Sequence, residues 1–451
     1  MTPAVPLLLL ALLAAPTQDA PPHDVAPAED RPGLGLAPDH AFFAPATPSP
    51  VPDPNTPEAC RARRVALAAE LGDGLVAVAA GADVDGRYQP DPLFHWLTGV
   101  STPDVVLLLE IQDGAVARER LYLPEKDAFF ERWNGWRPAP GPESVERFGI
   151  AETAPLGDWS GDLTALVEAD PDLRPHVLGD ALTEVLAARD VTQRSAARLI
   201  RRVAAVRTPA ELAAIGAAVD MTQQALAEGF RQVRPGNWEY QAEAAIEGGY
   251  RGRGAVGPSF PSIVGSGPNS CYLHYRANER QFQAGDLVVM DVGARYEGYC
   301  ADVTRTVPVS DDFTPRQREV YQAVWDASLA GAATLKPGAT MGDAHRAAKA
   351  VLDERGFGEY FLHSVGHGLG LLVHDDPGGR MPLAPGMVVT IEPGVYIAEE
   401  ALGVRIENDW VITADGAVCI SDELPSDPDA LLAFLAEVRG TSEPPPDRPG
   451  G

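Results

Sequence analysis

The sequence predicts an α/β domain followed by an α+β domain with a mixed, mostly antiparallel sheet backed by helices. Three observations support this prediction. Helical apolar spacing alternates with short β-rich runs over residues 58–190. A long helical stretch follows and ends at Pro235 and Gly236. Over residues 260–422, glycine and proline turns separate β-rich runs, with a helical interlude at 314–356.

The composition is that of a globular protein with more than one domain. The chain has 451 residues, enough for two or three domains, and 45% of them are hydrophobic. It carries 64 acidic and 36 basic side chains, which gives a formal net charge of −28. Such an acidic surface repels nucleic acids and anionic membranes, so we expect neither nucleic acid binding nor stable membrane insertion.

Both ends of the chain differ from its globular part. Residues 4–15 form an apolar run of signal-peptide length, too short to span a bilayer comfortably. We interpret residues 1–20 as a signal peptide and expect a secreted or periplasmic protein; a disordered leader on a cytoplasmic protein is the alternative. Residues 21–57 are rich in proline and alanine and predict a disordered linker. Residues 431–451 predict the end of a helix and a proline-rich tail.

The first domain is expected over residues 58–190. Residues 59–71 have helical apolar spacing, and residues 74–81 predict a strand. Further elements are two strands and a helix, predicted at 105–111, 119–124 and 161–169.

The second domain is expected over residues 191–430 and opens with helices. Residues 190–206 predict one helix, and residues 208–233 predict another. In the latter, Thr208 can cap the first turn, Pro209 fits its first position and Glu211 is acidic there.

An apolar hairpin in the second domain contains two acids. Residues 288–306, VVMDVGARYEGYCADVTRT, predict two strands with a turn near the middle. If the hairpin is symmetric about Tyr296 and Glu297, Asp291 lies opposite Asp302. Like charges in that arrangement destabilise a sheet, so the pair needs a compensating group.

Two further acids interrupt apolar β runs, Glu392 in MVVTIEPGVYI and Glu407 in GVRIENDWVIT. A single acid of this kind is usually a salt-bridged core residue. Arg305 and Arg405 can pair with some of the four acids but not with all of them. Since an unpaired buried carboxylate is costly, protonation or a bound cation is the usual solution.

A glycine-rich segment, HSVGHGLGLLVHD, adds three histidines at His363, His367 and His374. Its glycines argue against a regular helix, so a helical zinc site is not expected. Four carboxylates and one imidazole are the ligands and the charge that two divalent cations need. Oxygen-rich ligation suits Mn²⁺, which we prefer, with Co²⁺ and Zn²⁺ as alternatives. Two such ions about 3.5–4 Å apart can turn a shared water into a hydroxide nucleophile near neutral pH.

The four cysteines are widely spaced and contain no CxxC motif. We expect them to be mostly free and buried, because a chain of this length does not need disulfides. A ligand role for Cys300, two residues before Asp302, is disfavoured because the neighbouring carboxylates prefer harder metals.

These motifs, in this order, resemble the pita-bread metallopeptidases, specifically the Xaa-Pro aminopeptidases (aminopeptidase P). The four acidic and histidine-rich segments and FPSIVGSGPNSCYLHY, residues 260–275, carry the resemblance, which covers about residues 195–422. Residues 88–140 resemble that family's N-terminal domain more loosely. The resemblance implies a pita-bread catalytic domain after an aminopeptidase P type N-terminal domain.

The resemblance also implies residue roles. Asp291 would hold one metal ion, Asp302 and Glu407 would bridge both, and His367 and Glu392 would hold the other. Glu392 would also shuttle a proton to the leaving amine.

Other residues would serve the substrate. His274, His363 and His374 would surround it, and one of the latter two would stabilise the oxyanion. Arg405 would orient Glu407 or Asp302. The candidates for the family's aromatic lid are Trp96 and the preceding His95.

The implied activity is hydrolysis of the N-terminal Xaa-Pro bond of peptides. The alternative on the same metal site is an Xaa-Pro dipeptidase (prolidase). A creatinase-like hydrolase without metal, or an inactive binding module, is disfavoured because all five ligand positions are present. The family further implies a homodimer or homotetramer in which the N-terminal domain reaches a neighbour's site.

Overall fold

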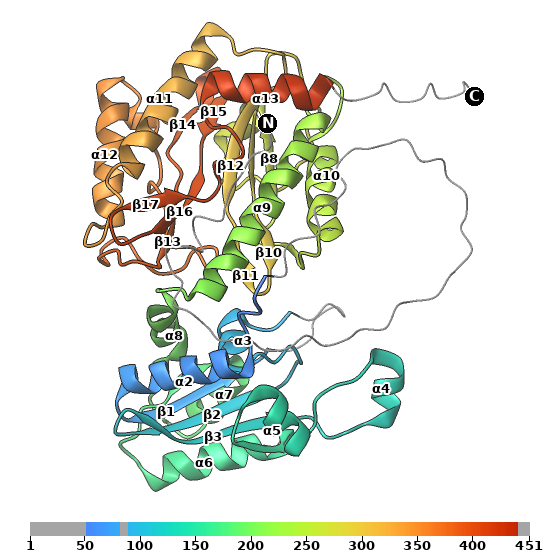
Figure 1. Ribbon diagram of the computed structural model, residues 1–451, viewed down its shortest axis with the longest axis vertical. Helices are drawn as coiled ribbons and strands as arrows, with labels where there is room; N and C mark the ends of the chain where they lie inside the picture. Colours follow the sequence, from blue (N-terminus) through green and yellow to red (C-terminus); the bar gives the residue numbers. More distant parts are fainter. Residues whose placement is uncertain (1–50, 82–88, 441–451) are drawn as a thin grey trace, which may run out of the picture. The chain divides into compact units, whose positions relative to one another are not determined.

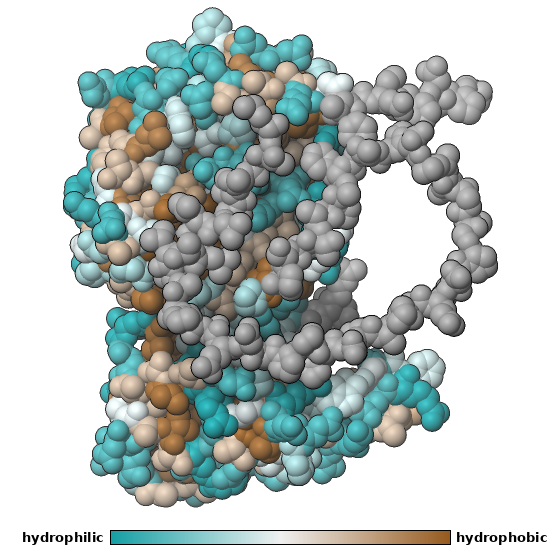
Figure 2. Space-filling view, viewed as in Figure 1, coloured by the Kyte–Doolittle hydropathy of each residue, from teal (hydrophilic) through white to brown (hydrophobic). Residues whose placement is uncertain are grey.

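The computed structural model describes residues 51–81 and 89–440, and the described residues from Pro52 to Gly440 form one compact unit. The predicted signal peptide, residues 21–50 of the predicted linker and residues 441–451 of the predicted tail lie outside the described residues. Within the described residues, no helix is long and apolar enough to cross a membrane. On the face shown in Figure 2, hydrophilic residues are widespread and hydrophobic residues form smaller, separate groups.

The N-terminal region contains a six-stranded mixed sheet with helices packed around it, as an α/β domain requires. The strand order is β4-β3-β2-β1-β5-β6. The pairs β1–β2 and β2–β3 are antiparallel, and the other three pairs are parallel. Its strands are β1 Gly74–Ala79, β2 Val106–Gln112, β3 Ala115–Leu123, β4 Glu152–Pro155, β5 His176–Leu178 and β6 Arg194–Ser195. Its helices are α2 Pro57–Leu71, α3 Pro92–Thr98, α4 Ala128–Asn134, α5 Pro142–Phe148, α6 Trp159–Ala169, α7 Asp180–Ala187 and α8 Ala196–Ala204.

The C-terminal region is built from short antiparallel sheets between pairs of helices (Figure 1). All its described strand pairs are antiparallel, which confirms the predicted pairing. Its strands are β7 Gly257–Pro258, β8 Ile263–Ser266, β9 Leu287–Val292, β10 Ala294–Tyr296, β11 Tyr299–Cys300, β12 Val303–Pro308, β13 Val388–Ile391, β14 Gly394–Ile397, β15 Leu402–Arg405, β16 Asn408–Ile412 and β17 Ala417–Cys419. Its helices are α9 Pro209–Gln232, α10 Glu239–Gly252, α11 Pro315–Ala332, α12 Met341–Glu354 and α13 Pro428–Gly440.

Helix α9 begins where the sequence predicts. Thr208 Oγ1 accepts the backbone N–H of Glu211, and the Glu211 side chain accepts the backbone N–H of Thr208. This reciprocal capping satisfies two backbone donors that the helix itself leaves free. The buried face of α9 joins the apolar core that lies beneath β9 and β12.

The helix predicted over residues 190–206 is wrong in its first part. Helix α8 begins only at Ala196, because Arg194 and Ser195 form β6 and pair in parallel with β5. The sheet therefore overrides the local helical pattern.

Two runs predicted as single strands are each broken at an acid. Glu392 and Pro393 separate β13 from β14, and Ile406 and Glu407 separate β15 from β16. The proline has no N–H to donate to a sheet, so pairing stops there. Both acids consequently lie where the chain passes from one sheet to another.

The predicted register of the β9–β12 hairpin is also wrong. Thr304, and not Asp302, is paired with Asp291. The turn lies one residue later than expected, at Glu297 (φ 49°) and Gly298 (φ 87°). Two consecutive residues in the left-handed region form the turn that matches the twist of a hairpin. Asp302 lies just before β12 instead.

Candidate metal centre

The site lies where four chain segments meet, and the local breaks in the strands place its acids. Asp291 is on β9, and Asp302 precedes β12. A Cβ atom at Gly293, between these strands, would lie 1.8 Å from the Ala301 carbonyl oxygen. Only glycine permits this close approach, which brings the segments that carry Asp291 and Asp302 together.

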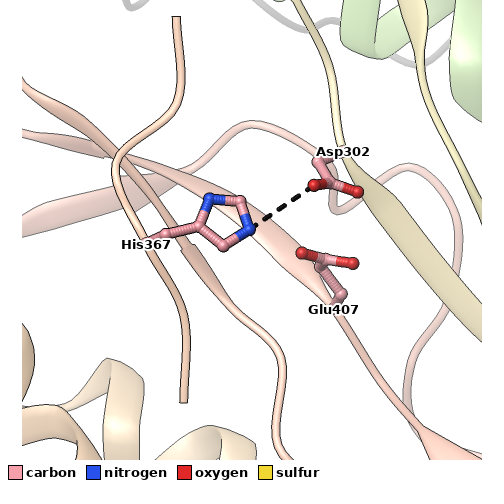
Figure 3. A group of neighbouring side chains, drawn as sticks. All are labelled: Asp302, His367 and Glu407. Atoms are coloured by element: carbon pink, nitrogen blue, oxygen red, sulfur yellow. Dashed lines mark ion pairs between the residues drawn. The ribbon is translucent and has the colours of Figure 1, made fainter. Parts of the chain in front are cut away.

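Three predicted ligands form a compact group. Asp302, His367 and Glu407 each present a ligand atom, and these atoms lie within 4.8 Å of one another. Figure 3 shows the imidazole of His367 facing the two carboxylates. The Nε2 atom of His367 lies 3.6 Å from Asp302 Oδ2 and 3.3 Å from Glu392 Oε1. These separations leave room for a cation among the side chains.

The carboxylates fit a bound cation. Three of their oxygens are buried without a hydrogen-bond partner among the described residues, namely Asp291 Oδ1, Asp302 Oδ1 and Glu407 Oε1. Unsatisfied buried oxygens are costly in an apoprotein and are what metal ligation uses. Hard oxygen donors with one imidazole suit a divalent cation.

Electrostatics supports the same conclusion. Burial, followed by the neighbouring acids, raises the pKa of Asp302 and that of Glu407 well above the ordinary range. Burial also raises the pKa of Glu392 to about 8, although Arg405 opposes the shift. Without a cation, these groups therefore tend to hold protons at neutral pH; a divalent ion removes that tendency.

The histidines are held in the tautomers that a metal site and a substrate pocket need. In His367, Nδ1 contacts the Gly368 carbonyl at 3.1 Å, which leaves Nε2 free to act as a ligand. In His363, Nδ1 contacts the Ser364 carbonyl at 2.8 Å and Nε2 contacts the hydroxyl of Tyr396 at 2.9 Å. Burial lowers the pKa of His363 and of His367 to about 4, so both rings are neutral at pH 7.

Arg405 contacts a different acid from the one expected. Its Nη2 donates to Asp291 Oδ2 at 2.6 Å, and Nη1 donates to the Tyr396 hydroxyl at 2.8 Å. It reaches Glu407 only indirectly, because Thr304 Oγ1 accepts from Arg405 Nε and donates to Glu407 Oε2. Arg405 therefore pairs directly with Asp291, and its link to Glu407 runs through Thr304.

Arg305, the other arginine expected to pair with an acid, forms no ion pair within residues 51–81 and 89–440. It is fully buried and donates to backbone carbonyls, including that of Glu407 at 2.6 Å, and to the side chain of Asn408. Its function here is to hold the chain around Glu407 in place.

A cavity of about 440 Å³ opens beside the acids. Its wall brings together most of the predicted site residues, including Asp291, Glu392, Arg405 and the four histidines predicted for the metal and the substrate. His274 and His374 are exposed on its rim, and the rings of His367 and His374 lie 4.2 Å apart. The cavity can thus hold a small polar ligand against the acidic cluster.

The lid residues predicted in the N-terminal region do not serve as an exposed lid. Trp96 is only 3% exposed, and its Nε1 donates to Glu211 Oε1 on α9 at 2.7 Å. His95 is half-buried and contacts the Val100 carbonyl. Glu211 also accepts from Arg63 and Tyr299, so Trp96 belongs to a buried polar network.

The four cysteines are free, as expected. Cys60 and Cys300 are buried, and Cys271 and Cys419 are partly buried. Burial raises the pKa of Cys300 to about 11, and its sulfur lies 3.6 Å from the Leu371 carbonyl. A neutral thiol engaged in this way is a poor metal ligand.

Two further buried acids, Asp375 and Asp409, lie near the site and were not predicted from the sequence. Asp409 follows Glu407 by two residues, and alternation along a strand could have placed both side chains on one face. Burial and Glu407 raise the pKa of Asp409 well above its ordinary range. Asp375 lies in the cavity wall between Arg201 and Arg207, and no local pattern indicated these distant partners.

The N-terminal and the C-terminal regions each match a known protein family. Residues 60–173 match the aminopeptidase P N-terminal domain, and residues 213–414 match metallopeptidase family M24. The chain is 30% identical over 436 residues to an Xaa-Pro aminopeptidase of Escherichia coli, covering 84% of this chain and 97% of the relative. It is 36% identical over 223 residues to an Xaa-Pro dipeptidase of Pyrococcus furiosus, covering 49% of this chain and 64% of the relative.

A solved structure shows the same arrangement. The structure of aminopeptidase P from E. coli with the inhibitor Pro-Leu superposes with a TM-score of 0.76 at 27% identity. The match covers 86% of this chain and 99% of that chain.

Proposed function

Because this chain belongs to metallopeptidase family M24 and begins with an aminopeptidase P type domain, we propose that it hydrolyses the N-terminal Xaa-Pro bond of peptides. The observation that carries the proposal is the set of three unpartnered buried oxygens on Asp291, Asp302 and Glu407 beside His367. A bound cation would satisfy these oxygens and offset the cost of burying the carboxylates.

The residues divide into metal ligands and substrate groups. The proposed ligands of two divalent ions are Asp291, Asp302, His367, Glu392 and Glu407. When bound, such ions supply an activated water for attack on a peptide carbonyl. Mn²⁺ is the preferred ion because oxygen donors predominate, with Co²⁺ and Zn²⁺ as alternatives.

Glu392 is the proposed proton carrier between water and leaving amine. It lies between two histidines, with Oε1 3.3 Å from His367 Nε2 and Oε2 3.9 Å from His363 Nδ1. His274, His363 and His374 line the cavity and would position the substrate, and one of His363 and His374 would stabilise the oxyanion. Arg405 would hold the carboxylate of Asp291 in its orientation.

The choice between aminopeptidase and dipeptidase is tested with two substrates. We expect the Mn²⁺-loaded protein to release arginine from Arg-Pro-Pro. Cleavage of Gly-Pro alone would replace the proposal with an Xaa-Pro dipeptidase, which the similarity to the Pyrococcus relative over 49% of this chain keeps as the second candidate. The retained ligand positions argue against a creatinase-like hydrolase and against an inactive binding module.

We also propose a homodimer or homotetramer. Aromatic side chains protrude from the segment around α4, where Phe129 is 72% and Trp133 is 74% exposed. Exposed aromatics of this size usually mark an interface. Sedimentation of the wild type and of Trp133→Ser tests the assignment: we expect the variant to shift toward monomer, and a wild-type monomer would refute it.

Export to the periplasm or the medium is proposed from the apolar run at residues 4–15. Fractionation of cells that express the full chain tests this. We expect a shortened product outside the cytoplasm, and a full-length cytoplasmic product would exclude export.

A further inference from the structure

Glu239 is a fully buried acid at the first position of α10, and it is not one of the proposed metal ligands. Its Oε1 accepts the backbone N–H of Ser266 at 2.7 Å and the Ser266 hydroxyl at 2.6 Å. Its Oε2 accepts the hydroxyl of Tyr275 and the backbone N–H of Arg280, both at 2.9 Å. The backbone N–H of Glu239 also donates to the Arg280 carbonyl at 3.0 Å. Glu239 therefore binds both ends and the middle of residues 266–280.

This segment, residues 266–280, carries His274, which lines the cavity beside the acids. The rings of His363 and His367 are each oriented by a contact between Nδ1 and a backbone carbonyl. Within residues 51–81 and 89–440, no hydrogen bond orients the ring of His274, which is exposed at the cavity rim. The position of that ring therefore depends on the backbone that carries it.

Two contacts hold the chain on either side of His274. The carbonyl of Leu273 accepts Arg405 Nη2 at 3.4 Å, and the hydroxyl of Tyr275 donates to Glu239 at 2.9 Å. The second contact is the shorter one, and its acceptor is a buried carboxylate, which strengthens a hydrogen bond. Glu239 is therefore the stronger of the two anchors next to His274.

We propose that Glu239 is a positioning residue for peptide binding, which holds residues 266–280 so that His274 keeps its place in the cavity wall. This inference rests on the proposed function, in which His274 positions the substrate. It deepens that proposal because it assigns a task to a buried acid that is not among the residues lining the cavity. Glu239 would act on the substrate only through His274.

The first test is Glu239→Gln, which keeps the size of the side chain and replaces one acceptor oxygen with an amide group that cannot accept. We expect kcat/KM for Arg-Pro-Pro to fall by up to about 100-fold, because displacing a positioning group by about 1 Å can cost that much. The dissociation constant for Mn²⁺ should equal that of the wild type, since the contacts of Glu239 lead to residues 266–280 and not to the proposed ligands.

The decisive measurement repeats this substitution in a His274→Ala background. If Glu239 acts through His274, the double variant should have the kcat/KM of His274→Ala alone, because two residues that act together are not additive. A general structural role of Glu239 would instead give the same fold-loss in both backgrounds, and that result would overturn the inference.

Tyr275→Phe is the second variant, for use if Glu239→Gln does not fold. It removes only the hydroxyl that contacts Glu239 and Glu279 N–H. We expect kcat/KM to fall about 2–10-fold, which corresponds to the net contribution of one hydrogen bond, and to stay unchanged when His274 is already alanine.

Glu279→Gln is the matched control, because it makes the same chemical change at an exposed position of the same segment. Its kcat/KM should equal that of the wild type. Wild-type kcat/KM in the Glu239 and Tyr275 variants would also overturn the inference. A wild-type protein that hydrolyses no Xaa-Pro peptide would instead refute the proposed function itself.

Discussion

Among single residues, Glu392 differs from the other acids because both of its oxygens lie near histidines. Oε1 is 3.3 Å from His367 and Oε2 is 3.9 Å from His363, at the wall of the cavity. A carboxylate that faces the predicted ligand His367 and also the cavity can accept a proton from a water and return it to a substrate group. That property suits a proton carrier better than a purely structural acid.

Glu392→Gln preserves size and removes the proton-accepting charge. We expect kcat on Arg-Pro-Pro to fall about 10²–10⁴-fold, the usual contribution of general acid–base catalysis. Steady-state kinetics on protein with a wild-type circular dichroism spectrum checks the prediction. Glu399→Gln is the control, because Glu399 is exposed beyond β14. A kcat within threefold of wild type would remove Glu392 from the proposed role.

At the scale of elements, the close approach at Gly293 holds the acid-bearing hairpin together. An added Cβ atom would lie 1.8 Å from the Ala301 carbonyl oxygen and 2.6 Å from Ser259 Oγ. We therefore expect Gly293→Ala to lower the free energy of unfolding by about 1–3 kcal/mol or more, as overpacking does. Urea denaturation measures the loss.

Gly248→Ala makes the same chemical change on the exposed face of α10, where nothing lies within 4 Å of the added atom. Alanine favours a helix by up to about 1 kcal/mol over glycine, so this control should be neutral or stabilising. Equal stability of both variants would show that the approach at Gly293 is not needed.

The histidine-bearing loop depends on Asp375. Its carboxylate pairs with Arg207 at 2.8 Å and with Arg201 at 3.1 Å, and the Asp375 and Arg207 side chains are fully buried. It also accepts the backbone N–H of Leu371. Arg201 further donates to the His374 carbonyl. This arrangement fixes the loop to α8 through Arg201 and to the segment between α8 and α9 through Arg207.

Removing one partner of a buried ion pair leaves a charge without compensation. We expect Asp375→Asn to cost about 3–5 kcal/mol of unfolding free energy and to lower kcat as the loop loosens. Asp376→Asn, whose nearest ion-pair contact is 3.9 Å long and partly exposed, should cost about 1 kcal/mol or less. Similar losses in the two variants, measured by urea denaturation, would contradict the assigned role.

The elements also show what sequence reasoning can and cannot reach. Acids inside apolar runs can be recognised from the sequence as candidate site residues, because burying a charge is costly wherever the run lies in the fold. The start of α9 follows from Thr208, Pro209 and Glu211 alone. The hairpin register does not follow from the local sequence. It depends on a positive φ at Glu297, which few non-glycine residues adopt.

Partners of buried side chains were the least predictable feature. The ion pair of Arg405 with Asp291 and the position of Asp409 both follow from that register and from strand breaks at Glu392 and Glu407. Local sequence gives the residue types of the site, whereas tertiary pairing decides which of them touch.

For the whole molecule, the acidic site makes stability depend on pH and on metal. The folded-state pKa of Glu392, about 8, exceeds its ordinary value of 4.5, so folding takes up protons and stability falls as pH rises through that window. His363 and His367, with pKa values of about 4 against 6.5, act oppositely, but only below about pH 6.5.

We therefore expect the melting temperature of the metal-free protein to fall between about pH 6.5 and 8, where Glu392 loses its proton in the folded state. Saturating Mn²⁺ should abolish most of the decline, because a bound cation keeps the carboxylates ionised. Differential scanning fluorimetry of both forms checks this. A metal-free protein that becomes more stable over the same range would contradict the electrostatic account.

The central claim is that the acidic cluster exists to bind a pair of cations. Anomalous diffraction from crystals of the Mn²⁺-loaded protein tests it most directly. We expect two peaks about 3.5–4 Å apart, both next to Asp302 and Glu407, with His367 and Glu392 beside one and Asp291 beside the other. A single peak, or manganese only at positions away from these side chains, would contradict the account.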